Sequence, residues 1–288
     1  MASILDMIGN TPIIRLNEIE KSMNLKAHLY AKLEYFNPFG SIKDRAALRI
    51  IRDAEKRILI ESKILVEASS GNLGIAISAI SNILGYKSII VMPENMSSSR
   101  FKLLKKYGAT IVTSNESSGM GGAIKVAQQM AKNTGGYYCD QFNNHSSIEA
   151  HILSTAPEID ISLSKNIDAV ICGIGSGGTI SGVGQYFKSQ GYKTKIYGVE
   201  PDVFPHGIQG IGAGFVPKIL DETIIDEIYK VNYDKAICAC NTLLRLSSIF
   251  VGISSGAVLE AGIEIAKRRE YENKNIVLIF ADSGERYI

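Results

Sequence analysis

Short, fully apolar runs alternate with helical segments through most of this chain. We expect strands at 64–68, 88–92, 110–112, 137–139, 168–172, 195–199 and 275–280. Helical patterns follow at about 71–84, 98–107, 123–132 and 148–153, from about 179, and at 257–268. Strands that are apolar on both faces belong in a parallel sheet covered by helices on both sides. The alternation therefore predicts an α/β fold with mostly parallel sheets, whose ligands bind beyond the carboxyl ends of the strands.

Size, charge and hydropathy exclude several classes of protein. The chain has 288 residues, enough for one large unit or two closely packed halves. Its net charge of +2 gives no indication of a nucleic-acid partner. No apolar stretch approaches the ~20 residues of a membrane span, so we expect no membrane association. Residues 1–7 lack the basic region of a signal peptide, which favours a cytoplasmic location.

The cysteines and histidines show no pattern of metal ligation. The four cysteines are scattered, and two of them lie two residues apart on an expected helix, facing different sides: Cys139, Cys172, Cys238 and Cys240. Free thiols in a reducing cytosol are the better interpretation. The four histidines have no metal-ligand spacing, so no metal site is expected.

The segment Asn37–Arg45 is the first candidate for chemistry. An Asn-Pro pair and Gly40 interrupt regular structure, and Ser41 can cap the helix that residues 46–51 then fill. Lys43 therefore lies at a helix N-terminus, where the helix dipole and partial burial both lower the pKa of an amine. A Schiff-base lysine needs this environment. On this segment alone, a solvated lysine in a first helical turn is the alternative.

A glycine-rich turn, Ser69–Gly74, directly follows the expected strand at 64–68. Its serines can cap the next helix and present backbone N–H groups to an anion such as a carboxylate. Asn72 adds an amide that can bond a phenolate oxygen. An ordinary helix cap with glycines for close packing explains the same residues, so this turn does not decide the function by itself.

A second turn, Gly173–Thr179, again joins a strand to a helix. Its backbone N–H groups and two hydroxyls suit a phosphate at a helix N-terminus. The turn also matches G-x-G-x-x-G from Gly173 to Gly178, and Glu200 ends the next strand, as in dinucleotide-binding proteins. That alternative stays open here, although such a motif usually opens the first βαβ unit of its domain and this one lies past mid-chain.

A third turn, Gly252–Gly256, matches the G-x-S-x-G pattern of a hydrolase nucleophile elbow. That mechanism needs a histidine later in the chain, and none follows His206. The hydrolase interpretation therefore fails. A neutral serine hydroxyl at the start of a helix can instead hold a heterocyclic nitrogen.

Together these segments resemble the cysteine synthase and cystathionine β-synthase family of pyridoxal-phosphate enzymes, with the cysteine synthase branch nearest. Ile8–Leu16, Asn37–Arg45, Gly210–Phe215 and Ser283–Tyr287 look like family motifs, and the match runs through nearly the whole chain. The resemblance implies the tryptophan synthase β-like fold, fold type II. In that fold two three-layer αβα domains with mostly parallel sheets enclose the active site in the cleft between them.

The resemblance also implies how the chain is divided and what it binds. Residues 1–288 would form a single catalytic unit. Within it, about 44–145 would be a smaller, mobile N-terminal subdomain with the substrate loop, and about 1–43 and 146–288 a larger subdomain that anchors pyridoxal 5′-phosphate. We expect a homodimer. Family members also bind the peptide tail of a partner enzyme in the active-site cleft, which makes such a partner a further possibility.

Site residues carry over position by position. Lys43 would hold the cofactor in Schiff-base linkage and shuttle protons, Asn72 would bind its O3′ oxygen, and Ser254 its pyridine nitrogen. The phosphate would lie against Gly175, Ser176, Gly177, Gly178 and Thr179. Substrate binding would fall to Ser69, Ser70, Asn72, Leu73, Gln141 and Gly212.

The implied reaction is a β-replacement on a serine-type amino acid. A serine at the ring nitrogen leaves the pyridine largely unprotonated and makes the cofactor a weaker electron sink. This favours prompt loss of a β-leaving group to give an aminoacrylate, to which a sulfur nucleophile adds. The leading expectation is cysteine synthase, which converts O-acetylserine and sulfide to cysteine and acetate.

Departures from the family pattern affect the substrates rather than the cofactor. Ser69 and Leu73 stand where threonines are usual, Ala156 stands where glycine is usual, and the segment 200–208 is short. An apolar wall at Leu73 suits a leaving thiol better than a leaving acetate. The alternative is therefore a cysteine-consuming β-replacement that releases hydrogen sulfide and forms lanthionine or cystathionine. An inactive partner-binding relative and a dinucleotide-binding protein are more distant alternatives.

Overall fold

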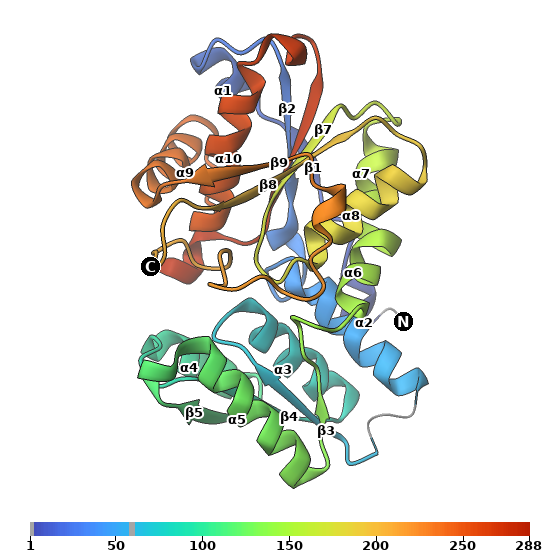
Figure 1. The fold of residues 1–288 in the computed structure, drawn as a ribbon, viewed down its shortest axis with the longest axis vertical. Coiled ribbons are helices and arrows are strands. Elements are labelled where there is room, and N and C mark those ends of the chain that lie inside the picture. Colours follow the sequence, from blue (N-terminus) through green and yellow to red (C-terminus); the bar gives the residue numbers. More distant parts are fainter. Residues whose placement is uncertain (1–2, 58–60) are drawn as a thin grey trace.

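Two separate sheets form the framework of the computed structural model, which describes residues 3–57 and 61–288 (Figure 1). The larger sheet has the strand order β1-β2-β10-β7-β8-β9. Its strands are β1 (Ile13–Arg15), β2 (His28–Leu33), β7 (Ala169–Gly173), β8 (Lys195–Pro201), β9 (Glu227–Val231) and β10 (Asn275–Phe280). The edge strand β1 runs antiparallel to β2, and the other neighbouring strands pair in parallel.

The smaller sheet has four parallel strands in the order β5-β4-β3-β6. They are β3 (Ile64–Ala68), β4 (Lys87–Pro93), β5 (Thr110–Ser114) and β6 (Tyr137–Tyr138). One face packs against α3 (Asn72–Leu84) and α4 (Ser98–Lys106), and the other against α5 (Gly119–Thr134). Alternate residues of β3 enter different cores, with Leu65 on the first face and Val66 on the second, as the pleat of a strand requires.

The larger sheet is also covered on both faces. Helices α1 (Asn17–Ser22), α9 (Tyr233–Ser247) and α10 (Ile253–Ala266) pack on one face, and α7 (Ala156–Ser162) and α8 (Gly178–Ser189) on the other. Strand β10 is buried along its whole length, which explains its continuous apolar run. The prediction of an α/β fold with two three-layer units and mostly parallel sheets is confirmed.

Helix α2 (Lys43–Lys56) lies between the two parts of the molecule that these sheets form (Figure 1). It packs against α3 beside the smaller sheet and against α6 (Ser146–Ala150). After α6 the helix continues through a π-helical turn, His151–Thr155, directly into α7. Helix α2 is therefore held by elements from both parts of the molecule.

The apolar-run rule overlooked three strands for identifiable reasons. The edge strand β1 has only three residues, β2 contains the buried Lys32, and β9 exposes or half-exposes four of its five residues. On α9, Cys238 is exposed and Cys240 is buried, as their spacing predicted. No helix in the described part of the chain has the length and apolar character needed to cross a membrane.

Candidate active site

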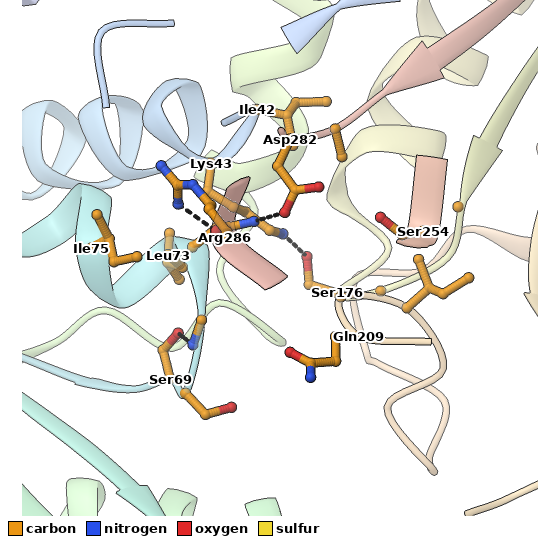
Figure 2. Close-up of a pocket in the computed structure, with 18 of the residues that line it drawn as sticks. Ile42, Lys43, Ser69, Leu73, Ile75, Ser176, Gln209, Ser254, Asp282 and Arg286 are labelled. Atoms are coloured by element: carbon orange, nitrogen blue, oxygen red, sulfur yellow. Dashed lines mark hydrogen bonds between the residues drawn. The ribbon is translucent and has the colours of Figure 1, made fainter. Parts of the chain in front are cut away.

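A cavity of about 750 Å³ opens at the carboxyl ends of β3, β7 and β10. It is lined by the turns that follow these strands, by α4 and by the chain end after Ala281. Most of the predicted site residues line it: Lys43, Ser69, Ser70, Asn72, Leu73, Gln141, Gly175, Ser176, Gly177, Thr179 and Ser254. Figure 2 shows Lys43, Ser176 and Asp282 close together in this cavity.

Two predicted residues are not part of the cavity lining. Gly178 begins α8 and faces the backbone and Cβ of Ser147, so its place is in helix packing. Gly212 donates its backbone N–H to the carbonyl of Ile174 (2.9 Å), and a Cβ there would meet His206. Their neighbours in the chain line the cavity, and these two glycines allow the close packing behind its wall.

Lys43 is the first residue of α2, and its amine points into the cavity (Figure 2). Its Nζ donates to Ser176 Oγ at 3.1 Å. Burial lowers the pKa of the amine to about 8, although the nearby carboxyl group of Glu67 acts to raise it. Ser41 was expected as the helix cap; the N-cap is instead Ile42, and Ser41 Oγ accepts the N–H of Lys43 (3.2 Å).

The turn at the start of α8 has the backbone of an anion cradle. Gly177 adopts φ +88°, and a Cβ there would lie 3.0 Å from Leu220. A Cβ at Gly175 would lie 2.4 Å from the carbonyl oxygen of Gly210. Side chains are therefore excluded on the packed side of the turn. The helix N-terminus and the Ser176 hydroxyl remain for a phosphate group.

The hydroxyl of Thr179 in this turn is oriented by His151. His151 Nε2 lies 3.2 Å from Thr179 Oγ1, and its Nδ1 lies 2.8 Å from Thr155 Oγ1. Burial holds the pKa of His151 well below its usual value, so the imidazole is neutral and carries one proton. When Nε2–H donates to Thr179, the Thr179 hydroxyl is left to donate to an anion.

Asn72, the first residue of α3, is held between two charged groups. Its Nδ2 donates to Asp282 Oδ2 (2.6 Å), and its Oδ1 accepts from Arg286 (2.5 Å). Tyr287 donates its hydroxyl to the same Asp282 oxygen (2.5 Å). A carboxylate on one side and a guanidinium on the other fix which amide atom is nitrogen. One N–H of Asn72 is then left for a ligand oxygen.

Ser254 lies at the opposite side of the cavity, in the first turn of α10 (Figure 2). It is buried, and a Cβ on Gly210 would come within 3.7 Å of its hydroxyl oxygen. A hydroxyl group can hydrogen-bond a ring nitrogen without adding charge. An amine, a phosphate cradle, an amide donor and this hydroxyl together match the functional groups of pyridoxal phosphate, so the site fits this cofactor.

The turn Ser69–Gly74 is preorganised at the start of α3. Ser69 Oγ accepts the backbone N–H groups of Gly71 (3.3 Å) and Gly74 (3.1 Å), which leaves its own proton to donate. Gln141 is less available than expected, because its Nε2 donates to Glu67 Oε1 (3.3 Å) and to the carbonyl of Ala68 (3.2 Å). In this conformation it does not offer an N–H to a substrate carboxylate.

Sequence reasoning did not identify several polar residues of the lining, among them Arg100, Gln209, Asp282 and Arg286. Asp282 directly follows β10, so the rule about carboxyl ends of strands would have found it. Arg286 lies in a tail segment that the sequence singled out without assigning a role. Arg100 is on α4, where its spacing carries no signal.

The geometry does not support the alternatives from the motifs. Glu200, which a dinucleotide site would use, lies outside the cavity lining and pairs with Lys230 (2.5 Å). As far as the chain is described, no histidine lines the cavity beside Ser254, as a hydrolase would need.

Residues 4–282 match the family described as pyridoxal-phosphate dependent enzymes, and the chain belongs to this family. It is an enzyme of fold type II whose cofactor is pyridoxal phosphate. Cysteine synthase 3 of Caenorhabditis elegans is 40% identical over 98% of this chain and 87% of that protein. The relationship to the cysteine synthases that the motifs indicated is confirmed.

Solved structures agree with this assignment. The cysteine synthase of Entamoeba histolytica is 35% identical with a TM-score of 0.95, and the match covers all of this chain and 89% of that one. A hydrogen sulfide-producing enzyme of Fusobacterium nucleatum is 35% identical with a TM-score of 0.94, over the full length of both chains.

Proposed function

We propose that this enzyme replaces the β-substituent of a serine-type amino acid with a sulfur nucleophile, and that its main reaction converts O-acetylserine and sulfide to cysteine and acetate. The observation that carries the proposal is the Lys43 amine, which lines the cavity and lies 3.1 Å from Ser176 Oγ in the anion cradle. The likeness to cysteine synthases supports the choice of substrates.

The residues proposed to bind the cofactor come from both parts of the molecule. Thr179, Ser176 and the N-terminus of α8 would hold the phosphate, Ser254 would hold the ring nitrogen, and Asn72 would hold the phenolic oxygen. Bound pyridoxal phosphate supplies an electron sink that acidifies the Cα–H of an amino acid and promotes loss of its β-substituent. Because Ser254 adds no charge at the ring, that sink stays moderate, which suits elimination followed by addition.

Lys43 and the Ser69–Gly74 turn act on the amino acid itself. With a pKa of about 8, the Lys43 amine can be neutral near neutral pH and can take a proton from Cα and return it after addition. The Ser69 hydroxyl and the N-terminus of α3 face the cavity and can hold the α-carboxylate. Leu73, only 2% exposed, closes this side with an apolar wall.

The test compares wild type with Lys43→Ala. Purified wild-type protein should be yellow and should form cysteine from O-acetylserine and sulfide. Lys43→Ala should lose at least 10³-fold in turnover, as is typical when a nucleophile that also moves protons is removed, yet still bind pyridoxal phosphate through the cradle. Appreciable turnover by the variant, or a colourless wild type that takes up no pyridoxal phosphate, would contradict the proposal.

A second reaction has specific support at Leu73. The apolar side chain lines the cavity where a thiol leaving group is more compatible than acetate, and one similar structure is a hydrogen sulfide-producing enzyme. We therefore propose cysteine as a second donor, with release of sulfide and formation of a thioether such as lanthionine or cystathionine. Incubation with cysteine alone should give both products, and Leu73→Thr should lower the sulfide. No sulfide from cysteine would show that Leu73 is a neutral variation.

We also propose that the chain acts as a homodimer in the cytoplasm. Exposed apolar side chains on η1 (Ile4–Met7) and α7, notably Met7 and Ile161, support a self-association surface. The Asn10 N–H donates to Glu158 of α7 (2.9 Å), which links the N-terminal segment to that helix. Three of the four free cysteines are buried, which suits a reducing compartment. Sedimentation at several protein concentrations tests the dimer.

The proposed division at about 44–145 predicts that the smaller part moves. Its substrate turn belongs to the four-stranded sheet, whereas the phosphate cradle belongs to the six-stranded sheet. Closure of one part on the other would therefore bring substrate and cofactor together. A peptide tail from a partner enzyme would compete for the same cavity, and inhibition by such a peptide would depend on substrate concentration.

A further inference from the structure

Arg100 spans the cavity from one part of the molecule to the other. It projects from α4 beside the smaller sheet, and its guanidinium donates to the carbonyl oxygen of Ser70 (2.5 Å). A second guanidinium nitrogen donates to the side-chain oxygen of Gln209, which lies on the opposite wall near Ser176 (Figure 2). The positive charge therefore lies in the cavity wall, between the substrate turn and the cofactor cradle.

The hydrogen-bond partners of Arg100 do not neutralise its charge, although its guanidinium acts to lower the pKa of the buried Asp282 carboxyl group. Both of its acceptors are neutral oxygens, and within the described residues it forms no ion pair. A guanidinium has five N–H donors in a planar fork, and these contacts use two of them. Arg100 thus keeps both the charge and the donors to bind a carboxylate.

The other cations of the lining are already committed. Lys43 serves the cofactor, and Arg286 donates to Asn72 and to the carbonyl of Phe39. Oδ2 of Asp282 accepts from Asn72 and from Tyr287, and its Oδ1 has no hydrogen-bond partner within the described residues, whereas Glu285 is exposed at the same cavity. Arg100 and Glu285 are a cation and an anion that the proposed reaction with sulfide does not use. A zwitterionic amino acid presents the complementary pair of charges.

We propose that Arg100 binds the carboxylate of the sulfur acceptor, and that this residue therefore determines how well the enzyme uses a thiol amino acid in place of sulfide. The inference rests on the proposed β-replacement, in which the Ser69–Gly74 turn holds the carboxylate of the donor. In the step, the Cβ–O bond of O-acetylserine or the Cβ–S bond of a cysteine donor breaks, and a new Cβ–S bond forms to the acceptor. Acetate or hydrosulfide leaves, and the thiol proton is released to water.

The first test uses acceptors that differ only in the charged groups around the thiol. With O-acetylserine fixed, kcat/KM is measured on the holoenzyme for cysteine, 3-mercaptopropionate, cysteamine and sulfide. Arg100→Leu should lower kcat/KM about 10- to 100-fold for the two carboxylate-bearing thiols and change it less than about twofold for cysteamine and sulfide, since a hydrogen-bonded charge pair contributes about 1.5–3 kcal/mol. Arg100→Lys should restore part of the loss. Lys102→Leu, on the exposed side of the same helix, should leave all four values unchanged.

The second test measures binding and does not depend on turnover. S-(2-carboxyethyl)cysteine and S-ethylcysteine are titrated into the holoenzyme, and binding is followed by the change in the visible spectrum. Wild type should bind the carboxyethyl compound at least tenfold more tightly, and Arg100→Leu should bind the two equally, with the affinity for S-ethylcysteine unchanged. This result without any β-replacement activity would refute the proposed function and keep the carboxylate site. Equal binding by wild type, or an equal loss for both compounds in Arg100→Leu, would overturn the inference and leave Arg100 as a support of Ser70.

Discussion

Lys43 has a lowered pKa that can be observed directly in cofactor binding. Burial lowers the pKa of its amine to about 8, so about a tenth of it is neutral at pH 7. Only the neutral amine attacks an aldehyde. We therefore predict that attachment of pyridoxal phosphate to cofactor-free protein accelerates about tenfold from pH 6 to pH 7 and levels off above pH 8. Stopped-flow absorbance at saturating cofactor measures this rate.

The control is 4-deoxypyridoxine 5′-phosphate, which has the phosphate but no aldehyde. Its affinity, measured by calorimetry, should lack the rise that follows the Lys43 amine, because the two compounds share every other titrating group that meets the phosphate cradle. An attachment rate that keeps rising up to pH 10 would show that the amine titrates like a solvated lysine.

Asp282 controls the orientation of the Asn72 side chain. Its Oδ2 accepts from Asn72 Nδ2 and from Tyr287, and burial raises the pKa of its carboxyl group. Asp282→Asn replaces a strong acceptor with an amide that cannot serve both donors equally well. Loss of one charge-assisted hydrogen bond, about 1.5–3 kcal/mol, should weaken cofactor binding roughly 10- to 100-fold and shift its visible absorbance. Dialysis equilibrium measures the affinity, and Asp202→Asn, at an exposed position, should leave it unchanged.

At the scale of elements, glycines decide how closely α8 approaches the rest of the site. A Cβ on Gly182 would lie 2.5 Å from the carbonyl oxygen of Ile148 and 2.7 Å from the Cβ of His151. Gly182→Ala should therefore push α8 away from the helix that carries His151. We predict a loss of about 2–3 kcal/mol in stability, typical of overpacking, together with weaker cofactor binding through Thr179.

Gly121→Ala is the matched control on α5. A Cβ there meets nothing within 4 Å, and its φ is not in the left-handed region. Alanine in an open helical position should raise stability by up to about 1 kcal/mol and leave cofactor affinity unchanged. Urea denaturation measures the change in stability of each variant. Equal stability of Gly182→Ala and wild type would mean that the close approach of α8 is not needed.

The elements that the sequence predicted share one property, which is that their signals are local. Apolar runs and the glycines of the turns 69–74 and 173–179 identify buried strands and the helix starts after them. The contacts that complete the site are not local. Asn72 meets Asp282 and Arg286 across 210 and 214 residues, so no spacing rule can find them. The π-helical turn at His151–Thr155 likewise makes a non-local contact, because it packs against α8 where Gly182 leaves room for His151.

At the scale of the whole molecule, a buried ionic cluster connects the start of α2 to two segments of the larger part, one at residues 32–34 and the other on α7. Arg45 pairs with Glu34 (2.7 Å) and with Glu158 (2.6 Å), and Glu158 also pairs with the fully buried Lys32 (2.6 Å). Two cations and two carboxylates balance, and the Arg45 guanidinium helps to hold the pKa of Glu158 at about 2. This cluster fixes the N-terminal segment, α2 and α7 relative to one another, only two residues from Lys43.

Asp44 is the buried acid beside this cluster that should make global stability depend on pH. Burial raises its pKa from 3.8 to about 7; one carboxyl oxygen accepts the N–H of Phe39 (2.7 Å), and the other has no hydrogen-bond partner within the described residues. Between these two pH values the folded state binds more protons than the unfolded state. The stability from neutral Asp44 is therefore fully present below about pH 4 and is lost as the pH rises through 7.

Asp44→Asn tests this linkage, because asparagine keeps the acceptor for Phe39 and stays neutral at every pH. A shift in pKa corresponds to about 1.4 kcal/mol per unit, so the unfolding free energy of the variant should gain about 1–4 kcal/mol on that of wild type between pH 4 and pH 7.5. Burial also raises the pKa of Glu67, but that group contributes the same slope to both proteins, and their difference isolates Asp44. Urea denaturation of the holoenzymes across this range measures the difference. Parallel curves would mean that Asp44 stays ionised in the folded protein and is stabilised by the positive charges of Arg45 and Arg286.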